Sequence, residues 1–290
     1  MQDPEEYGVG SATSIAHKIS LLRKQTGLLV TVATRLLEDA ERQEHKAFGS
    51  ALFFYTAAAS ESANSHILLV ENDKFRDAYV TGRTVFLSLV NACFTCAEGK
   101  QAAERALRYS SQKLLRDQRR KIKVGDLEMS IEAYVPARIE RDLELKAAIQ
   151  EFTGRKGRER RSWTDENLEQ QLGRIRAKYG RVVGGRLLLT LGLIYRPASE
   201  IAHGTVYGTA WSLGVNAPRL TCPPEKLRWR RQFNLDMLLY SICLCTCAAI
   251  EVIAKEFDSC AAFAIESNAT GNELSSWITD IDRKLRGLHE

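Results

Sequence analysis

The amino-acid sequence predicts an all-α protein, an antiparallel helical bundle with a basic helical insertion. Three observations predict this class. Apolar residues recur at every third or fourth position along most of the chain, which is the period of an α-helix. Neither strand-like alternation of convincing length nor an internal repeat is evident in the sequence. At 290 residues, with 44% hydrophobic and 27% charged residues and only six prolines, the chain is long enough for a large core and has a globular composition.

Four successive helices are predicted in the first part of the chain. Their ranges are 11–48, 51–72, 74–98 and 101–115. In the first range, the apolar positions from Ile15 to Leu36 form one stripe of an amphipathic helix. Gly49-Ser50 would break the chain after this helix, Asn72-Asp73 would cap the third helix, and Gly99 would end it.

A basic insertion is predicted after these helices. Arg116–Gly125 is the first clear change in composition, and Pro136 would open another helix at its first position, where a missing N–H costs nothing. A charged, glycine-bearing linker, Gly154–Arg161, then leads to a helix with Thr164 and Asn167 near its start and a glycine after its end.

The remaining segments are mostly apolar. Val182–Tyr195 should be a helix buried on most sides, and a loop rich in Gly and Pro should follow His203 as far as residue 224. Two helices, one long and apolar and one short and amphipathic, complete the chain: 233–257 and 273–285. We expect antiparallel packing to bring the helix around Arg83 close to the helices that hold His203 and Cys245.

These segments predict four parts of the chain. They are a flexible N-terminus at 1–10, a helical core formed by 11–115 and 180–260, the basic insertion at 116–179 and a C-terminal helix at 261–290.

Cysteine usage and the N-terminus both favour a cytoplasmic protein. Four of the seven cysteines lie inside apolar runs, where cysteine packs as a small hydrophobe, and we expect no disulfide framework and no metal site. The first ten residues are acidic and lack the apolar stretch of a signal peptide. The longest uncharged run, Met237–Ile250, has 14 residues and is too short to span a bilayer, so we expect no membrane association.

The net charge of +5 is distributed unevenly. Basic residues gather at 116–123, 155–161 and 228–231. Clustered Arg is typical of a protein that binds a polyanion, and RNA is the first candidate, with DNA or a nucleotide as alternatives. The residues we expect to bind nucleic acid are Arg119, Arg120, Lys121, Arg155, Arg158, Arg160, Arg161, Arg228, Arg230 and Arg231. The alternative is that these clusters are solvated charge beside helices.

The segment Tyr195–Gly208, "YRPASEIAHGTVYG", contains the strongest chemical signal. Ser199 lies four residues before His203, and Arg196 lies seven before it, so all three could share one face of a helix. Pro197 disfavours helical geometry at Arg196, so the helix could instead begin near Pro197, with Arg196 at its entrance, where backbone N–H groups favour anions. Either geometry places a cation, a hydroxyl and an imidazole around one small volume.

This arrangement resembles the Arg-x(4–6)-His motif of the all-α HEPN superfamily. More narrowly, the chain is similar to the bacterial family called domain of unknown function 5677 over roughly 51–208 and the apolar helix that follows. That family combines an early helix resembling "GRTVFLSLVNACF" with a later Tyr-x3-Ser-x3-His and a small residue. The matching positions are Arg83, Asn91, Tyr195, Ser199, His203 and Gly204.

The resemblance implies a metal-independent endoribonuclease without a cofactor, in a toxin or antiphage setting, with an antitoxin or other protein partner. His203 would be the general base or acid, Arg196 would hold the phosphate, and Ser199 and Tyr195 would orient the substrate, with Arg83 and Asn91 in support. It also implies a homodimer that pairs two copies of the motif.

Two features depart from the pattern of active HEPN proteins. Pro197 follows the arginine where active members commonly have a polar residue, and Leu87 and Ser88 stand where relatives often show an acidic residue. Some HEPN-like proteins are inactive, so a non-catalytic helical interaction or dimerisation module is the alternative function.

Overall fold

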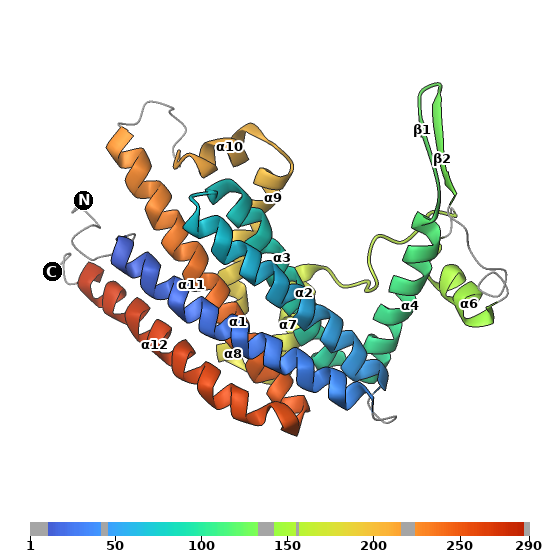
Figure 1. Cartoon of the computed structure of the whole chain (residues 1–290), viewed down its shortest axis with the longest axis horizontal. Helices are drawn as coiled ribbons and strands as arrows, with labels where there is room; N and C mark the ends of the chain where they lie inside the picture. The colour runs from blue at the N-terminus through green and yellow to red at the C-terminus, as the bar shows by residue number, and fades with distance from the viewer. Residues whose placement is uncertain (1–10, 42–45, 133–141, 155–156, 216–223, 287–290) are drawn as a thin grey trace.

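The predicted all-α class is confirmed. The computed structural model describes residues 11–41, 46–132, 142–154, 157–215 and 224–286, with side chains described outside 131–132 and 277–286. In these ranges long helices form a bundle, and a two-stranded hairpin projects from it (Figure 1). The larger helices are α1 (Ala12–Ala40), α2 (Lys46–Glu71), α3 (Phe75–Glu98), α4 (Lys100–Asp117), α7 (Leu168–Tyr179), α8 (Arg181–Thr190), α11 (Pro224–Glu256) and α12 (Ala261–Arg286). The smaller elements are β1 (Arg119–Val124), β2 (Leu127–Glu132), α6 (Leu143–Glu151), α9 (Arg196–Ala202) and α10 (Val206–Ser212).

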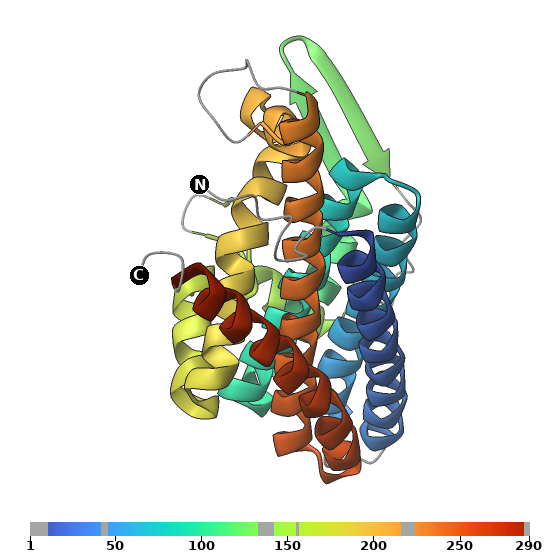
Figure 2. The same cartoon turned by 90° about the vertical axis from the view of Figure 1, so that its left-hand side faces the viewer.

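Helix α11 runs through the middle of the bundle. It contacts α1, α3, α8 and α12, and its apolar residues from Leu238 to Ile253 are almost all buried (Figure 2). By length and composition α3 and α11 could each cross a membrane, but 56% and 83% of their most apolar windows are buried inside the protein. Burial of this kind is typical of a core helix that is apolar on all sides.

A buried ion pair fastens α1 to α11. Lys18 Nζ lies 2.8 Å from Asp236 Oδ1, and both side chains are nearly inaccessible to solvent. Ser14 donates a hydrogen bond to the same carboxylate and accepts one from Lys18, at 3.1 Å and 2.7 Å. Burial is the largest effect on Lys18 and lowers its pKa, while Asp236 acts in the opposite direction.

The predicted helix ends are confirmed where they rest on specific capping chemistry. Asn167 and Gln170 form a capping box at the start of α7. Gly99 ends α3, and Gly180 ends α7, both with positive φ.

Two other predicted boundaries are wrong. Gly49 lies inside α2 and does not break the chain, and a Cβ there would come within 3.0 Å of Ala40, so this glycine lets α2 approach α1 closely. Asp73, in the left-handed region at φ 55°, forms the turn before α3, and the N-cap of α3 is Lys74.

The part of the insertion that we expected to be helical contains an antiparallel hairpin. Its register pairs Ile122 with Met129 and Val124 with Leu127, and Gly125, with φ 63°, opens the two-residue turn. The signal for it is the alternation in "KIKVGDLEMSI" around Gly-Asp, which the sequence prediction missed because each strand is only six residues long.

The second half shows four further differences. The loop predicted after His203 contains the short helix α10, the last helix begins at Ala261, well before residue 273, and α11 begins at Pro224. The apolar run from Val182 is not buried on most sides, because Val182 and Leu188 are 64% and 60% exposed. The predictions for residues 1–10 and Pro136 lie outside the described residues.

Candidate functional site

The motif lies on one continuous helical stretch. Helix α8 passes through a π-helical turn, Leu191–Tyr195, directly into α9. A proline ring cannot fit against the carbonyl of a regular α-turn, and the wider π-turn before Pro197 accommodates it. Arg196 is helical, with φ −65° and ψ −55°. The helix therefore does not begin near Pro197, and the proposed anion site at a helix entrance is wrong.

The end of α9 is a tight corner built on glycines. Gly204, with φ 67°, donates to Ile201 O at 3.1 Å, and Thr205 donates to Glu200 O at 3.2 Å, which is a Schellman motif. Thr205 then caps α10 by accepting a hydrogen bond from Gly208 N at 3.0 Å. A Cβ on Gly208 would lie 2.4 Å from the carbonyl carbon of Glu200. The small residue after His203 is thus required by the corner.

Arg196 and His203 are both exposed, and Ser199 between them is half-buried. Seven residues along a helix correspond to about 10 Å and nearly two full turns, so the two side chains start from the same face. Within the described part of the chain, neither side chain makes a hydrogen bond or an ion pair. The structure therefore brings these three residues to one solvent-facing surface.

Arg83 reaches the same helical stretch from α3. Its guanidinium carbon lies 5.0 Å from the centre of the Tyr195 ring, and Phe86 meets that ring edge-on at 6.3 Å. The Nε atom of Arg83 is buried and has no hydrogen-bond partner in the described chain. The contact expected between the Arg83 helix and the His203 helix is present, and it is a cation–π contact.

Asn91 does not join the site. It lies eight residues beyond Arg83, about 12 Å along the same helix. Its Oδ1 accepts a hydrogen bond from Trp163 Nε1 at 3.2 Å, and the Trp163 ring packs on Phe94 at 5.7 Å. Asn91 therefore holds the segment before α7 against α3.

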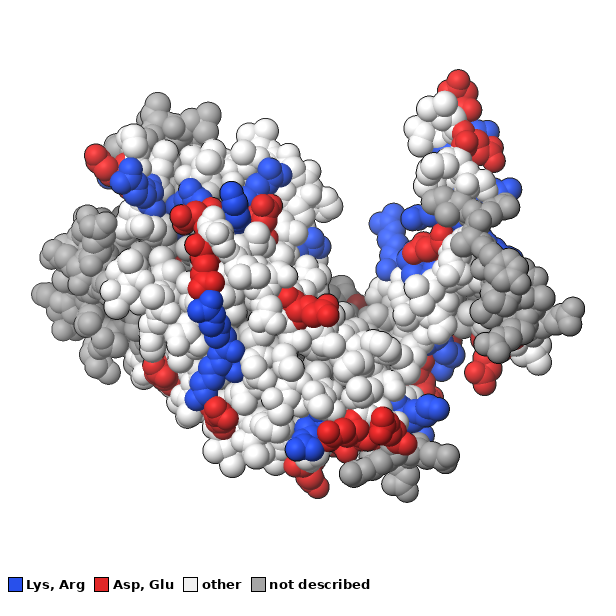
Figure 3. Space-filling view, viewed as in Figure 1, with Lys and Arg blue, Asp and Glu red and all other residues white. Residues whose placement is uncertain are grey.

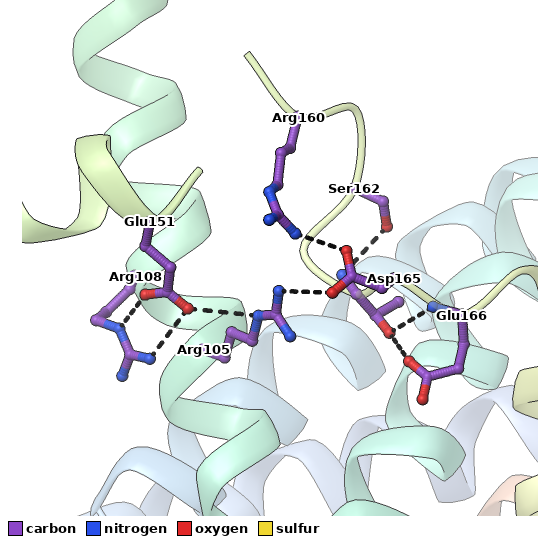
Figure 4. A network of polar contacts seen from close by, with 8 residues as sticks. Arg105, Arg108, Glu151, Arg160, Ser162, Asp165 and Glu166 are labelled. Atoms are coloured by element: carbon purple, nitrogen blue, oxygen red, sulfur yellow. Dashed lines mark hydrogen bonds and ion pairs between the residues drawn. The ribbon is translucent and has the colours of Figure 1, made fainter. Parts of the chain in front are cut away.

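Arg160, which we expected to bind nucleic acid, lies in a network of its own chain (Figure 4). Its guanidinium is 2.6 Å from Asp165, which also lies 3.4 Å from Arg105. Arg105 and Arg108 in turn contact Glu151, at 3.4 Å and 3.0 Å. The sequence prediction missed this network, because its carboxylates come from α6 and from the loop before α7.

Arg231 and Arg120 are also engaged by their own chain. Arg231 donates to Asp73 O at 2.9 Å and stacks over the Phe75 ring at 5.4 Å. Arg120 lies 3.8 Å from Asp117. Arg155 lies outside the described residues. Four of the other predicted residues are exposed and form no ion pair within the described ranges: Lys121, Arg158, Arg161 and Arg228.

A basic hollow lies at the foot of the hairpin. It has a volume of about 360 Å³ and is lined by Leu115, Arg116, Asp117, Arg119, Arg120, Lys121, Ile149 and Glu159. Figure 3 shows Lys and Arg side chains gathered at the foot of the hairpin, on the side facing the bundle. Four cations and two carboxylates give the hollow a positive balance.

The cysteines are core residues, as expected. The six in the described part of the chain are buried and form no disulfide. Burial raises the pKa of their thiols, that of Cys93 to about 12, so they are poor nucleophiles. Among the described residues no cluster of three or more His, Cys, Asp or Glu could hold a metal ion.

The fold and this surface define an all-α bundle that carries an exposed Arg/His pair and, at the end of α4, a two-stranded hairpin. The chain belongs to the family described as "Family of unknown function (DUF5677)", whose model matches residues 49–216. No curated protein and no solved structure matches the chain. The matched range contains the whole motif, the Arg83 helix and the hairpin.

Proposed function

We propose that this protein is a HEPN-like, metal-independent endoribonuclease that uses Arg196 and His203. One observation carries the proposal: both side chains are exposed on one face of a continuous helical stretch and have no partner in the described chain. A buried or paired histidine would have indicated a packing role. A cation and an imidazole that are both exposed on one face are instead available to a substrate.

The chemistry follows from the two side chains. RNA carries a 2′-hydroxyl that can attack the adjacent phosphate when a base removes its proton. His203 would move that proton, since imidazole is the side chain that exchanges protons most readily near neutral pH. Arg196 would hold the phosphate and stabilise its added charge in the transition state. Tyr195 and Ser199, on the same stretch, would orient the substrate.

A second copy would complete the proposed site. One imidazole cannot easily serve as base and acid in the same step, so we expect a homodimer that pairs two motifs. The surface directly after His203 supports this expectation, because Val206, Tyr207 and Leu213 are 86%, 53% and 58% exposed. Apolar side chains gathered at a surface are typical of protein interfaces.

RNA would be held through its backbone by the exposed basic residues and by the hollow at the foot of the hairpin. Such binding weakens as salt rises, because counterions are released from the phosphates. A toxin or antiphage system in the cytoplasm, with an antitoxin or other partner, is the setting we propose for this activity.

The test is cleavage of mixed RNA in the presence of EDTA. We expect the wild-type protein to cut RNA, and His203→Ala and Arg196→Ala to lose at least a hundredfold in rate, the usual contribution of a general acid or base. The control is Arg181→Ala, an exposed arginine near the start of α8. All three changes are at exposed positions and should leave Tm unchanged. Cleavage that persists in both site variants would rule the proposal out.

A non-catalytic interaction module is the second candidate, and a separate observation favours it. Tyr195, Gly204 and Asn91 all have packing or turn-forming roles, so most of the family pattern can be explained by folding. Under this alternative the wild-type protein leaves RNA intact, while Tyr195→Ala lowers Tm because the Arg83 contact is lost.

A further inference from the structure

The basic hollow at the foot of the hairpin is formed by three parts of the chain. The end of α4 supplies Leu115–Asp117, the start of β1 supplies Arg119–Lys121, and Ile149 and Glu159 line it from α6 and from the segment that follows α6. Its volume of about 360 Å³ lies within the range of small-ligand sites, about 300 to 1,000 Å³. The hollow is therefore large enough for a ligand bigger than a single ion.

Arg116 is held in place at the wall of the hollow. Its Nη2 donates to Ile149 O at 3.2 Å and to Thr153 Oγ1, and both acceptors lie at the end of α6. Its Nε is buried and has no hydrogen-bond acceptor in the described chain. A guanidinium that is already ordered loses little conformational freedom when it binds an anion.

The two carboxylates of the hollow already have cations beside them. Glu159 lies 3.1 Å from Lys113 Nζ, and Asp117 lies 3.8 Å from both Lys113 and Arg120. Even without Arg119, four cations stand against these two carboxylates, which leaves an excess of two positive charges. The four cations are Lys113, Arg116, Arg120 and Lys121.

Positive charge is balanced on both sides of the hollow. On the hairpin, Lys123 is the next basic residue on the face of Lys121, and it lies opposite Glu128. On α4, Arg105 and Arg108 both contact Glu151. Figure 3 shows the Lys and Arg side chains gathered at the foot of the hairpin, with Asp and Glu side chains nearer its tip. The excess cations are therefore concentrated at one point and do not continue as a stripe along the hairpin or α4.

A concentrated positive charge suits a terminal phosphate better than a backbone phosphate. Each phosphate of a nucleic-acid backbone carries one negative charge, whereas a phosphomonoester carries about 1.5 to 2 at pH 7. We propose that the hollow binds a phosphomonoester, the terminal phosphate of an RNA. The half-buried side chains of Leu115 and Ile149 give the hollow an apolar wall for the attached ribose. This inference deepens the proposed function and rests on it in naming RNA as the source of the phosphate.

The experiment compares three short uridine oligonucleotides of one length, with a 5′-phosphate, a 3′-phosphate or neither. Every sugar carries a 2′-O-methyl group, so no 2′-hydroxyl is present to start cleavage while binding is measured. Isothermal titration calorimetry with the full chain gives the Kd of each. We expect one phosphorylated oligonucleotide to bind about fivefold more tightly than the unphosphorylated one, because the added charge makes about one further ion pair.

The test variant is Arg120→Gln with Lys121→Gln, which removes two exposed cations of the hollow. The matched control is Lys123→Gln with Arg181→Gln, which removes the same charge from exposed positions outside the hollow. We expect the preference for the phosphorylated oligonucleotide to disappear in the test variant and to persist in the control. Both variants should keep the wild-type Tm, because all four positions are exposed.

Hydrogen exchange gives a second, independent readout. In the wild-type protein, amides in 115–121 should exchange more slowly with the preferred phosphorylated oligonucleotide than with the unphosphorylated one. Equal Kd values for the three oligonucleotides would overturn the proposal. So would a preference that persists in the test variant, or one that the test and control variants lose equally.

Uridine monophosphate distinguishes the two sources of a phosphomonoester. Weaker binding of the mononucleotide than of the phosphorylated oligonucleotide would support an RNA end as the ligand. Equally tight binding would support the phosphomonoester site but overturn the RNA end in favour of a free nucleotide. Cleavage is measured separately on unmodified RNA, so failure of the ribonuclease proposal leaves these outcomes unchanged.

Discussion

At the scale of single residues, the most informative side chain outside the motif is His66. It is fully buried in α2, and its Nδ1 donates a hydrogen bond to Ala78 O at 2.9 Å. Its Nε2 is buried and has no partner in the described chain. Burial lowers the pKa of His66 to about 4, because the charged imidazolium would lose its hydration. His66 is therefore a neutral packing residue, whereas His203 is exposed to solvent.

The lowered pKa of His66 predicts a pH-dependent stability. Between pH 6.5 and about 4 the unfolded chain binds a proton at His66 that the native chain does not bind, so stability falls as pH falls. This side chain alone should contribute a slope of up to about 1.4 kcal/mol per pH unit in that window and nothing above it. His66→Asn keeps a donor for Ala78 O but cannot titrate, so its slope should be smaller. Urea unfolding in steps from pH 7.5 to pH 5 measures both slopes, and equal slopes would contradict the prediction.

The residues of the candidate site were predictable where they depend on local spacing. Counting along a helix placed Arg196, Ser199 and His203 on one face, and antiparallel packing placed Arg83 nearby. The contacts of Asn91 and Arg160 were not predicted, because their partners, Trp163 and Asp165, come from a loop with no regular periodicity. The helical or strand-like spacing of residues in a sequence does not predict contacts made by such a loop.

At the scale of elements, helices were predicted best where apolar spacing and a specific cap agreed. Asn167, one of the two residues predicted near the start of α7, caps that helix, and Gly99 ends α3 as predicted. Gly49 was misread because a glycine that permits close helix approach looks the same in a sequence as one that breaks a helix. The π-turn before Pro197 was not predicted either, since a proline most often marks a helix start.

The corner between α9 and α10 gives a test at this scale. Gly208→Ala would force a Cβ against the Glu200 carbonyl, at 2.4 Å from its carbon, and should lower the free energy of unfolding by about 1 to 3 kcal/mol. Gly185→Ala is the matched control, because Gly185 is exposed in α8 and its Cβ would meet nothing within 4 Å. This change should raise stability by about 0.5 to 1 kcal/mol, because alanine favours the helix. Chemical denaturation measures both, and a neutral Gly208→Ala would show that the corner can relax.

At the scale of the whole molecule, the family segment and the folded body do not coincide. The segment 49–216 contains the site, but α1, α11 and α12 lie outside it. Two of these helices supply much of the core. Helix α1 contributes Leu22, Leu29, Val32 and Leu36, each fully buried, and α11 is buried along most of its length. The surface that presents Arg196 and His203 therefore depends on helices that carry none of the motif.

This dependence predicts that residues 46–215 cannot fold alone. Burying one large aliphatic side chain contributes about 1.5 to 3 kcal/mol, whereas a whole domain is stable by about 5 to 15 kcal/mol. Removing the four α1 side chains and the buried apolar residues of α11 therefore costs more free energy than the whole domain's stability. We expect the fragment 46–215 to show helical circular dichroism without a cooperative thermal transition and to aggregate.

The control, the chain without residues 1–10, keeps every helix described above and should melt cooperatively. Adding residues 224–290 and 11–41 as separate peptides should restore some cooperativity, because α11 and α1 pack non-covalently on α3 and α2. A monomeric 46–215 fragment that unfolds in one sharp transition would show instead that the family segment is a domain in its own right.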